Sequence, residues 1–163
     1  MRTGFGWDLH RLVEHRPLFI GGVEIPSSLG EDGHSDGDVL IHAVIDALLG
    51  ALALGDIGSH FPPSDPAWKD ARSALLLERV MEMIHAREYR PVNLDTTVVL
   101  EAPKLGPHIA RIRGSLADLL YIDVDTVSVK AKSHEKVGPV GEGRAVEAYA
   151  AVLLEKYDSS VWT

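Results

Sequence analysis

The chain is organised around residues 34–42, which read HSDGDVLIH. In this stretch a polar turn leads into a helix, since Asp38 is a favoured N-cap residue and the apolar residues after it recur at helical spacing. A second polar stretch, Trp7-Asp8-Leu9-His10, lies near the N-terminus. Together the two stretches hold three histidines and three aspartates in the first quarter of the chain. We interpret them as a metal site beside a phosphate-binding site.

The composition is typical of a single globular domain that needs no disulfide. The chain has 163 residues, no cysteine, 45% hydrophobic and 25% charged residues, and a chain of this length buries roughly two-thirds of its unfolded surface. No apolar run reaches the ~18 residues of a membrane span, and the first residues lack the apolar core of a signal peptide. We therefore expect a cytoplasmic protein. Its net charge of −8 would repel a nucleic acid, so we expect none as a partner.

Residue usage also suggests a thermophilic source. The chain has no glutamine, a single asparagine, and ten arginines against six lysines. Few heat-labile side chains together with many charges are typical of thermophilic proteins. Compositional drift in a GC-rich genome would give the same bias.

Hydrophobic periodicity and turn residues divide the chain into short strands and helices. We expect strands over residues 2–8, 91–100 and 126–131, a hairpin over 18–25 with a Gly-Gly turn, and helices over 38–55, 71–88 and 107–119. Residues 26–33 and 132–143 are expected to be loops. Residues 144–157 are ambiguous, because their composition favours a helix while the neighbouring strands would accept another strand.

Two further features bear on the site. Gly4 and Gly6 in the first strand indicate that its backbone passes close to another element. Residues 55–66 are too rich in Gly and Pro for regular structure and too long for a simple connection, so we predict a substrate lid there.

The candidate metal ligands come from both polar stretches. Asp8 and His10 are two residues apart and point to one face of an extended strand, and His42 lies near the start of the helix. One carboxylate and two imidazoles would suit a catalytic zinc site with an open position. The spacing alone leaves open a solvated His42. Likewise, residues 34–38 precede a helix N-terminus that favours an anion, but a plain polar turn fits the same residues.

The chain resembles the 2-C-methyl-D-erythritol 2,4-cyclodiphosphate synthase family of the non-mevalonate isoprenoid pathway. The resemblance runs in order over nearly the whole chain with almost no gaps. It rests on Gly4-Phe5-Gly6-Trp7-Asp8-Leu9-His10, Ile20-Gly21-Gly22-Val23-Glu24-Ile25-Pro26, His34-Ser35-Asp36-Gly37-Asp38, Asp46-Ala47-Leu48-Leu49-Gly50, Leu54-Gly55-Asp56-Ile57-Gly58, Phe61-Pro62, Ala102-Pro103-Lys104 and Lys130-Ala131.

The resemblance implies a fold and an activity. The fold would be α+β, a single domain over residues 1–163 with a mixed β-sheet and helices packed on one face, assembling as a homotrimer with sites between subunits. Residues 144–157 would then form a strand. The enzyme would be a phosphorus–oxygen lyase. The 2-phosphate of 4-diphosphocytidyl-2-C-methyl-D-erythritol 2-phosphate would attack the β-phosphorus of the same molecule, releasing CMP and the cyclic diphosphate.

The resemblance also implies roles for particular residues. Asp8, His10 and His42 would bind one Zn²⁺ per subunit, and Glu135 would bind Mg²⁺ or Mn²⁺. His34 and Ser133 would be catalytic, and Asp46 would act behind the zinc ligands or be a surface carboxylate. The substrate would contact Asp8, Leu9, His10, His34, Ser35, Asp56, Ile57, Gly58, Phe61, Pro62, Pro63, Ser64, Asp65, Leu100, Glu101, Ala102, Pro103, Lys104, Leu105, Gly106, Lys132, Ser133, His134 and Glu135.

The chain departs from the family pattern in three places. Lys132, Ser133 and His134 stand where the family usually has threonines, and only the serine keeps a hydroxyl. Residues 139–144 carry Pro139 and an exchanged Glu and Arg, and Pro63 replaces a common aspartate. We expect Lys132 and His134 to point outward.

Two other functions fit the same candidate ligands. A zinc-dependent phosphoester hydrolase would use the metal to activate water, but no convincing second general base lies near His10 and His42 in the sequence. A non-catalytic trimeric binding protein with structural zinc would be expected to use four protein ligands rather than three.

Overall fold

The computed structural model describes residues 1–33, 35–62, 64–68 and 71–157. Their elements follow in chain order as β1 (Arg2–Glu14), β2 (Leu18–Ile20), β3 (Val23–Ile25), β4 (Leu29–Glu31), α1 (Val39–Ala51), α2 (Ile57–His60), η1 (Pro66–Trp68), α3 (Ser73–His85), β5 (Tyr89–Val99), η2 (Gly106–His108), α4 (Ile109–Leu120), η3 (Val124–Thr126), β6 (Val127–Lys132), α5 (Gly138–Gly141) and β7 (Ala145–Lys156).

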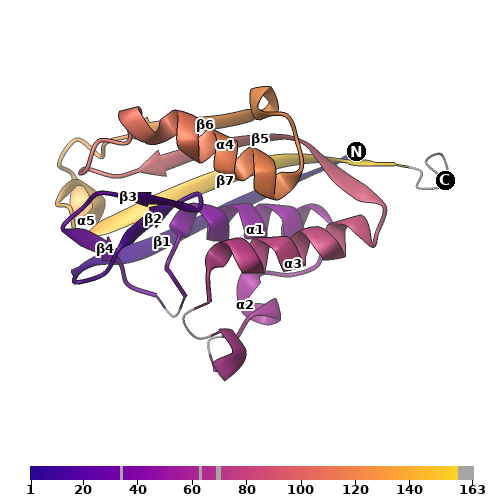
Figure 1. Cartoon of the computed structure of the whole chain (residues 1–163), viewed down its shortest axis with the longest axis horizontal. Coiled ribbons are helices and arrows are strands. Elements are labelled where there is room, and N and C mark those ends of the chain that lie inside the picture. Colours follow the sequence, from indigo (N-terminus) through magenta and orange to yellow (C-terminus); the bar gives the residue numbers. More distant parts are fainter. Residues whose placement is uncertain (34, 63, 69–70, 158–163) are drawn as a thin grey trace.

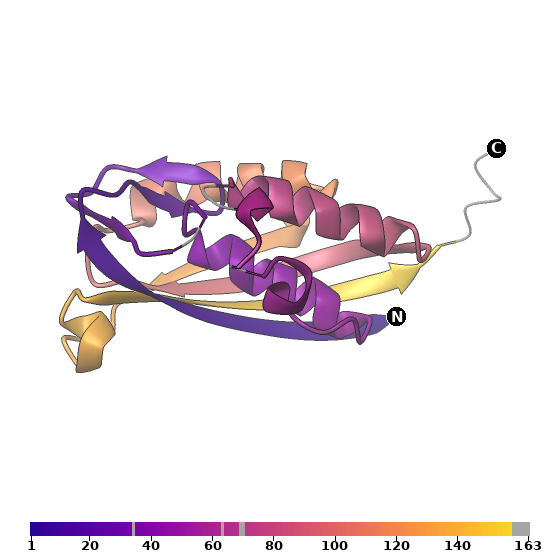
Figure 2. The same ribbon diagram turned by 90° about the horizontal axis from the view of Figure 1, so that it is seen from below.

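Within the described residues, five strands form a mixed sheet in the order β4-β1-β7-β5-β6. The neighbours pair antiparallel except β5 and β6, which are parallel. Figure 1 shows β1 and β7 crossing the length of the molecule, and Figure 2 shows α1, α3 and α4 together on one side of the sheet. The predicted α+β class and mixed sheet are confirmed, and the three long helices lie on one face as expected. The short helix α5 is an exception, since its Val140 packs beside Tyr149 on the other face. In these described ranges, no helix is both long and apolar enough to cross a membrane.

The contact between β1 and α1 is formed by backbone against backbone. A Cβ added at Gly4 would lie 1.8 Å from the carbonyl oxygen of Ala47, and one at Gly6 would lie 1.9 Å from that of Ala43. Such distances leave no room for any side chain, so the predicted close approach at these glycines is confirmed. The alanines of α1 complete the contact, because their small side chains let the helix sit directly on the strand.

Asp38 ties the start of α1 to the β2–β3 hairpin. Its Oδ1 accepts hydrogen bonds from the amides of Ile41 and Gly21 at 3.0 and 2.9 Å, and its Oδ2 accepts one from Gly22 at 2.6 Å. The predicted N-cap and the Gly-Gly turn are thus confirmed, and one buried carboxylate joins them. Burial raises the pKa of Asp38, against the lowering effect of these three amide donors.

The sheet face opposite the three long helices carries large apolar side chains. Phe5, Trp7 and Leu9 alternate along β1 with Gly4, Gly6 and Asp8, and Phe5 is 67% exposed. Tyr149 of β7 pairs with Trp7 across the strands and lies beside the Phe5 ring. An apolar row on an open sheet face is typical of a surface that another molecule covers.

Several expected boundaries were wrong. Residues 26–33 include β4, which pairs with β1, and α1 ends at Ala51 rather than at Gly55. Short helices, α2 and α5, lie in segments that were expected to be irregular. β4, α2 and α5 each have four residues or fewer, and their stability comes from contacts with neighbouring elements rather than from a periodic sequence pattern.

The strand assigned by resemblance to residues 144–157 is confirmed as β7. Its residues pair with β1 on one side and with β5 on the other. Its central place in the sheet outweighs a local helix propensity of a few tenths of a kcal/mol per residue.

The glycine contact can be tested by comparing two substitutions. Gly6→Ala should destabilise the protein by about 3 kcal/mol or more, because the new methyl group overlaps the backbone of α1. Gly114→Ala, in α4 with open space around the Cβ position, should be neutral or stabilising by up to ~1 kcal/mol. Urea unfolding at a fixed protein concentration measures both. Equal stability of the two variants would contradict the assigned contact.

Candidate metal site

Three side chains from β1 and α1 converge on one point. Asp8 and His10 project from the same face of β1 as Gly4 and Gly6, and His42 projects from the first turn of α1, beside Ala43. The Oδ2 of Asp8 lies 2.9 Å from His10 Nε2 and 3.1 Å from His42 Nδ1, and the two nitrogens are 3.3 Å apart. One ligand atom from each residue lies within 4.8 Å of the others. The predicted three residues are therefore together.

The second nitrogen of each imidazole faces a protein partner. His10 Nδ1 lies 2.8 Å from Glu31 Oε2 and 2.6 Å from the carbonyl oxygen of Gly37. His42 Nε2 lies 3.0 Å from Ser73 Oγ, which donates to Asp36. With both outer nitrogens protonated, the two inward nitrogens carry lone pairs. A carboxylate oxygen and two imidazole lone pairs suit zinc with an open position.

Charge and burial shift the pKa values of this group. Burial alone would raise the pKa of Asp8, but hydrogen bonds and charge attraction from His10 and His42 outweigh it and hold the pKa well below its usual range. Burial would lower the pKa of His10, but hydrogen bonds to Asp8 and Glu31 raise it to about 10. A cation entering the group competes with that proton, so its binding is coupled to proton release.

The three residues line a cleft of about 270 Å³. Ser35 adds to its polar lining, and the apolar part of the lining consists of Ile57, Gly58 and Phe61 with Trp68 and Leu76. The Phe61 and Trp68 rings pack edge to face at 5.0 Å between centroids. The cleft thus combines a polar end that can hold a cation with an apolar wall that can hold a carbon chain.

The predicted lid forms part of this wall. α2 begins after Asp56, which caps it by accepting from the Ser59 amide at 2.8 Å. Asp46 of α1 accepts a hydrogen bond from the amide of Ile57 at 2.8 Å. Asp46 is therefore an anchor for the start of α2, a contact that neither of its two expected roles included.

Ser35 is held by protein groups. Its Oγ accepts from the Gly37 amide at 3.1 Å and lies 3.3 Å from His42 Nε2. Its predicted phosphate contact stays a prediction. His34 and Pro63, two other predicted substrate contacts, lie outside the described residues. Pro62, Ser64 and Asp65 follow Phe61 and are not among the residues that line the cleft.

A second group of predicted site residues lies at the far end of β5 and β6. Residues 100–106 follow β5, and residues 132–135 comprise the last residue of β6 and the three after it. The Leu100 amide donates to the Lys132 carbonyl and the His134 amide to Glu101. Ser133 Oγ donates to Glu135 at 2.6 Å. Lys132 and His134 are exposed. None of this group is among the residues that line the metal cleft.

Sequence reasoning missed Gly33, Trp68 and Leu76, which line the cleft, and Glu31 and Ser73, which lie behind the two imidazoles. Glu31 was assigned to a loop and Ser73 to the interior of a helix. Of these residues, only Trp68 could have been assigned to the cleft from the sequence, since a tryptophan in a Pro-rich segment after a predicted lid is a candidate pocket residue.

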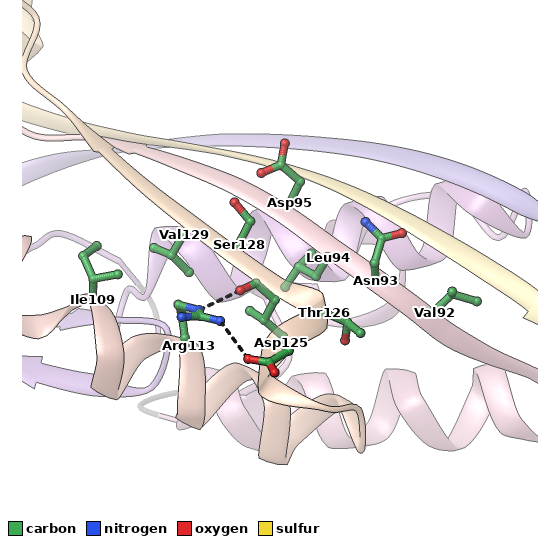
Figure 3. Close-up of a pocket in the computed structure, with 11 residues that line it drawn as sticks. Val92, Asn93, Leu94, Asp95, Ile109, Arg113, Asp125, Thr126, Ser128 and Val129 are labelled. Carbon is green, nitrogen blue, oxygen red and sulfur yellow. Dashed lines mark hydrogen bonds and ion pairs between the residues drawn. The ribbon is translucent and has the colours of Figure 1, made fainter.

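A wider and shallower hollow of about 730 Å³ lies between α4 and the start of β6. Figure 3 shows one of its charged residues, Arg113, directed at Asp125 of η3. The guanidinium donates to the carbonyls of Val127 and Val124 at 2.7 Å each. Arg113 thus fastens α4 to the edge of the sheet, and we assign no ligand to this hollow.

Comparisons with known proteins agree on one family. A model of the YgbB family matches residues 1–155. The 2-C-methyl-D-erythritol 2,4-cyclodiphosphate synthase of Gloeobacter violaceus is 58% identical over 156 residues, which are 96% of this chain and 96% of that protein. The synthase of Chloroherpeton thalassium is 54% identical over 96% of this chain and 99% of its own.

Solved structures agree as well. A 2C-methyl-D-erythritol-2,4-cyclodiphosphate synthase bound to CDP matches with a TM-score of 0.88 and 41% identity over 94% of this chain and all of that chain. The bifunctional IspDF of Campylobacter jejuni matches with a TM-score of 0.92 and 36% identity over 96% of this chain. This chain spans 42% of that longer protein.

Removal of one candidate ligand tests the group. Loss of a residue that hydrogen-bonds to a metal ligand typically lowers metal affinity ~10–100-fold. Because His42→Ala removes a ligand itself, we expect the affinity of the metal-free protein for Zn²⁺ to fall by more than this. His15→Ala, which removes a side chain that is 94% exposed, should leave the affinity unchanged. Competition with a chromophoric chelator measures both, and circular dichroism checks the fold. Unchanged zinc stoichiometry in His42→Ala would refute the ligand assignment.

Proposed function

The chain belongs to the YgbB family, and from this premise we propose how its cleft performs the reaction for which its curated relatives are named. The activity is the synthesis of 2-C-methyl-D-erythritol 2,4-cyclodiphosphate, a phosphorus–oxygen lyase reaction of the non-mevalonate pathway. The substrate is 4-diphosphocytidyl-2-C-methyl-D-erythritol 2-phosphate. Its 2-phosphate attacks the β-phosphorus, the bond to the CMP oxygen breaks, and CMP leaves.

The observation that carries the mechanism is the convergence of Asp8, His10 and His42 at the polar end of an apolar-walled cleft. These three residues would hold one zinc ion per subunit, and such an ion would supply positive charge that neutralises the negative charge of the diphosphate. The donor set fits this ion, because the outer nitrogens of both histidines already have protein partners.

The cleft residues contribute mainly by orienting the substrate. An intramolecular attack gains its rate from a fixed in-line geometry, with the reacting atoms held about 3–3.5 Å apart. Ile57, Gly58 and Phe61 pack against the methylerythritol carbons, since they form the wall facing the metal group. His34 and Ser35 contact the phosphates, and His34 stabilises the charge that develops during the attack.

The second group of residues binds the nucleotide part. We assign the cytosine to residues 100–106; relatives that were solved with CDP support the binding of a cytidine nucleotide. Ser133 would contact the diphosphate, and the exposed carboxylate of Glu135, a hard oxygen ligand, would hold a Mg²⁺ or Mn²⁺ ion. The metal cleft and this second group are lined by different residues of one chain.

This separation supports a homotrimer with sites between neighbouring subunits. The open sheet face with Phe5, Trp7, Leu9 and Tyr149 supplies an apolar surface for such an assembly. Each complete site would then combine the metal cleft of one subunit with the nucleotide-binding residues of the next. We treat residues 1–163 as one synthase domain; the cytoplasmic location and the thermophilic source remain predictions.

The activity is tested by phosphorus NMR. With the cytidine diphosphate substrate, we expect cyclic diphosphate and CMP to appear, and a chelator should abolish turnover until zinc and magnesium are restored. Inorganic phosphate instead of the cyclic product would identify the hydrolase alternative. No turnover with bound metal would favour a binding protein.

The assembly is tested by sedimentation. We expect the wild-type protein to sediment as a trimer and the Phe5→Glu variant to shift toward monomer. The reason is that trimer formation would bury the new charge on the apolar face without a partner. Leu75→Glu, on α3 with 42% exposure, is the matched control and should remain a trimer. A wild-type protein that sediments as a monomer would refute the trimer.

A further inference from the structure

Glu31 is a buried carboxylate behind the metal group. It is the last residue of β4, pairs with Leu12 of β1, and is 0% exposed. Its Oε2 lies 2.8 Å from His10 Nδ1 and accepts a hydrogen bond from the Val39 amide at 2.9 Å. Its Oε1 has no hydrogen-bond partner among the described residues.

Capping of α1 does not account for a carboxylate in this place. Asp38 already caps the helix through the Ile41 amide, and a neutral side chain could accept from the Val39 amide. A buried carboxylate with one unsatisfied oxygen destabilises the fold unless a hydrogen-bonded or positively charged partner compensates. The partner that Glu31 faces is His10.

The hydrogen bonds of His10 define the direction of its ring. Its Nδ1 faces both Glu31 and the carbonyl of Gly37, so the proton of the neutral ring resides on Nδ1. Nε2 then carries its lone pair toward Asp8 Oδ2, 2.9 Å away, and toward His42. A rotated ring would lose both partners of Nδ1 at once.

His42 is supported in a different way. Its outer nitrogen contacts the neutral hydroxyl of Ser73, and the carboxylate of Asp36 lies one step further away. The outer nitrogens of the two imidazoles therefore have different partners. His10 faces a carboxylate directly, whereas His42 faces a hydroxyl group that in turn donates to a carboxylate. A direct carboxylate increases the basicity of a ligating imidazole more strongly than a hydroxyl does.

We propose that Glu31 is a positioning residue for the metal group: it fixes the tautomer and ring orientation of His10 and strengthens Nε2 as a ligand. This inference rests on the proposed function, because it requires that His10 binds a metal. Glu31 touches neither substrate nor metal and acts through His10.

The test measures metal affinity of the full-length, metal-free protein. Glu31→Leu keeps a similar volume and removes the acceptor, and we expect its Zn²⁺ dissociation constant to rise about 10–100-fold. Glu31→Gln keeps an acceptor without the charge and should give a smaller rise. Chelator competition supplies the constants. Visible absorption of the Co²⁺-loaded protein should also shift in both variants, because it reports the ligand field directly.

Thr96→Val provides the control for general destabilisation. It removes a buried hydrogen bond from Thr96 Oγ1 to the Ser128 carbonyl, on β5 and away from the cleft, and should change neither the zinc constant nor the Co²⁺ spectrum. Metal binding by Glu31→Leu within twofold of wild type would overturn the inference while leaving the proposed function intact. If Glu31→Leu does not fold, an unchanged constant and spectrum in Glu31→Gln would overturn it. A wild-type protein that binds no metal would overturn both proposals together.

Discussion

The rest of the structure depends on the direct backbone contact between β1 and α1. Gly4 and Gly6 let the strand approach the carbonyls of Ala47 and Ala43 closer than any side chain would allow. Because side chains alternate along a strand, the residues that follow these glycines on the same face are Asp8 and His10. The same contact that packs the core therefore places two candidate ligands against the helix that carries His42.

Two buried or half-buried carboxylates then hold the elements around the site. Asp38 joins the start of α1 to the β2–β3 hairpin, and Asp46 joins the body of α1 to the start of α2. The segments that line the cleft are thus joined to α1 by hydrogen bonds as well as by apolar contacts, since Phe61 and Leu76 belong to the same core cluster as α1. A fixed cleft of this kind suits a phosphoryl transfer that depends on positioning.

The two faces of the sheet differ in the chemistry of their side chains. Its helix-covered face carries the core and, at one end, the metal group, while its open face carries Phe5, Trp7 and Leu9. Because side chains alternate along a strand, β1 contributes residues to both faces. A change in the register of β1 by one residue would exchange ligands and aromatic residues between the two faces, so the pairing with β7 is a condition for both.

The sequence by itself determined the features that depend on neighbours along the chain: the Asp38 cap, the Gly-Gly turn, the alternation of β1, and the position of His42 near the start of a helix. Family resemblance added the assignment of β7 as a strand, which local propensity opposed. Only the tertiary structure decided the three-residue β4, the short helix α2, and the places of Glu31 and Ser73 behind the two imidazoles. These contacts join residues 21 and 31 positions apart, and no local pattern encodes such a pairing because its energy appears only when distant segments pack together.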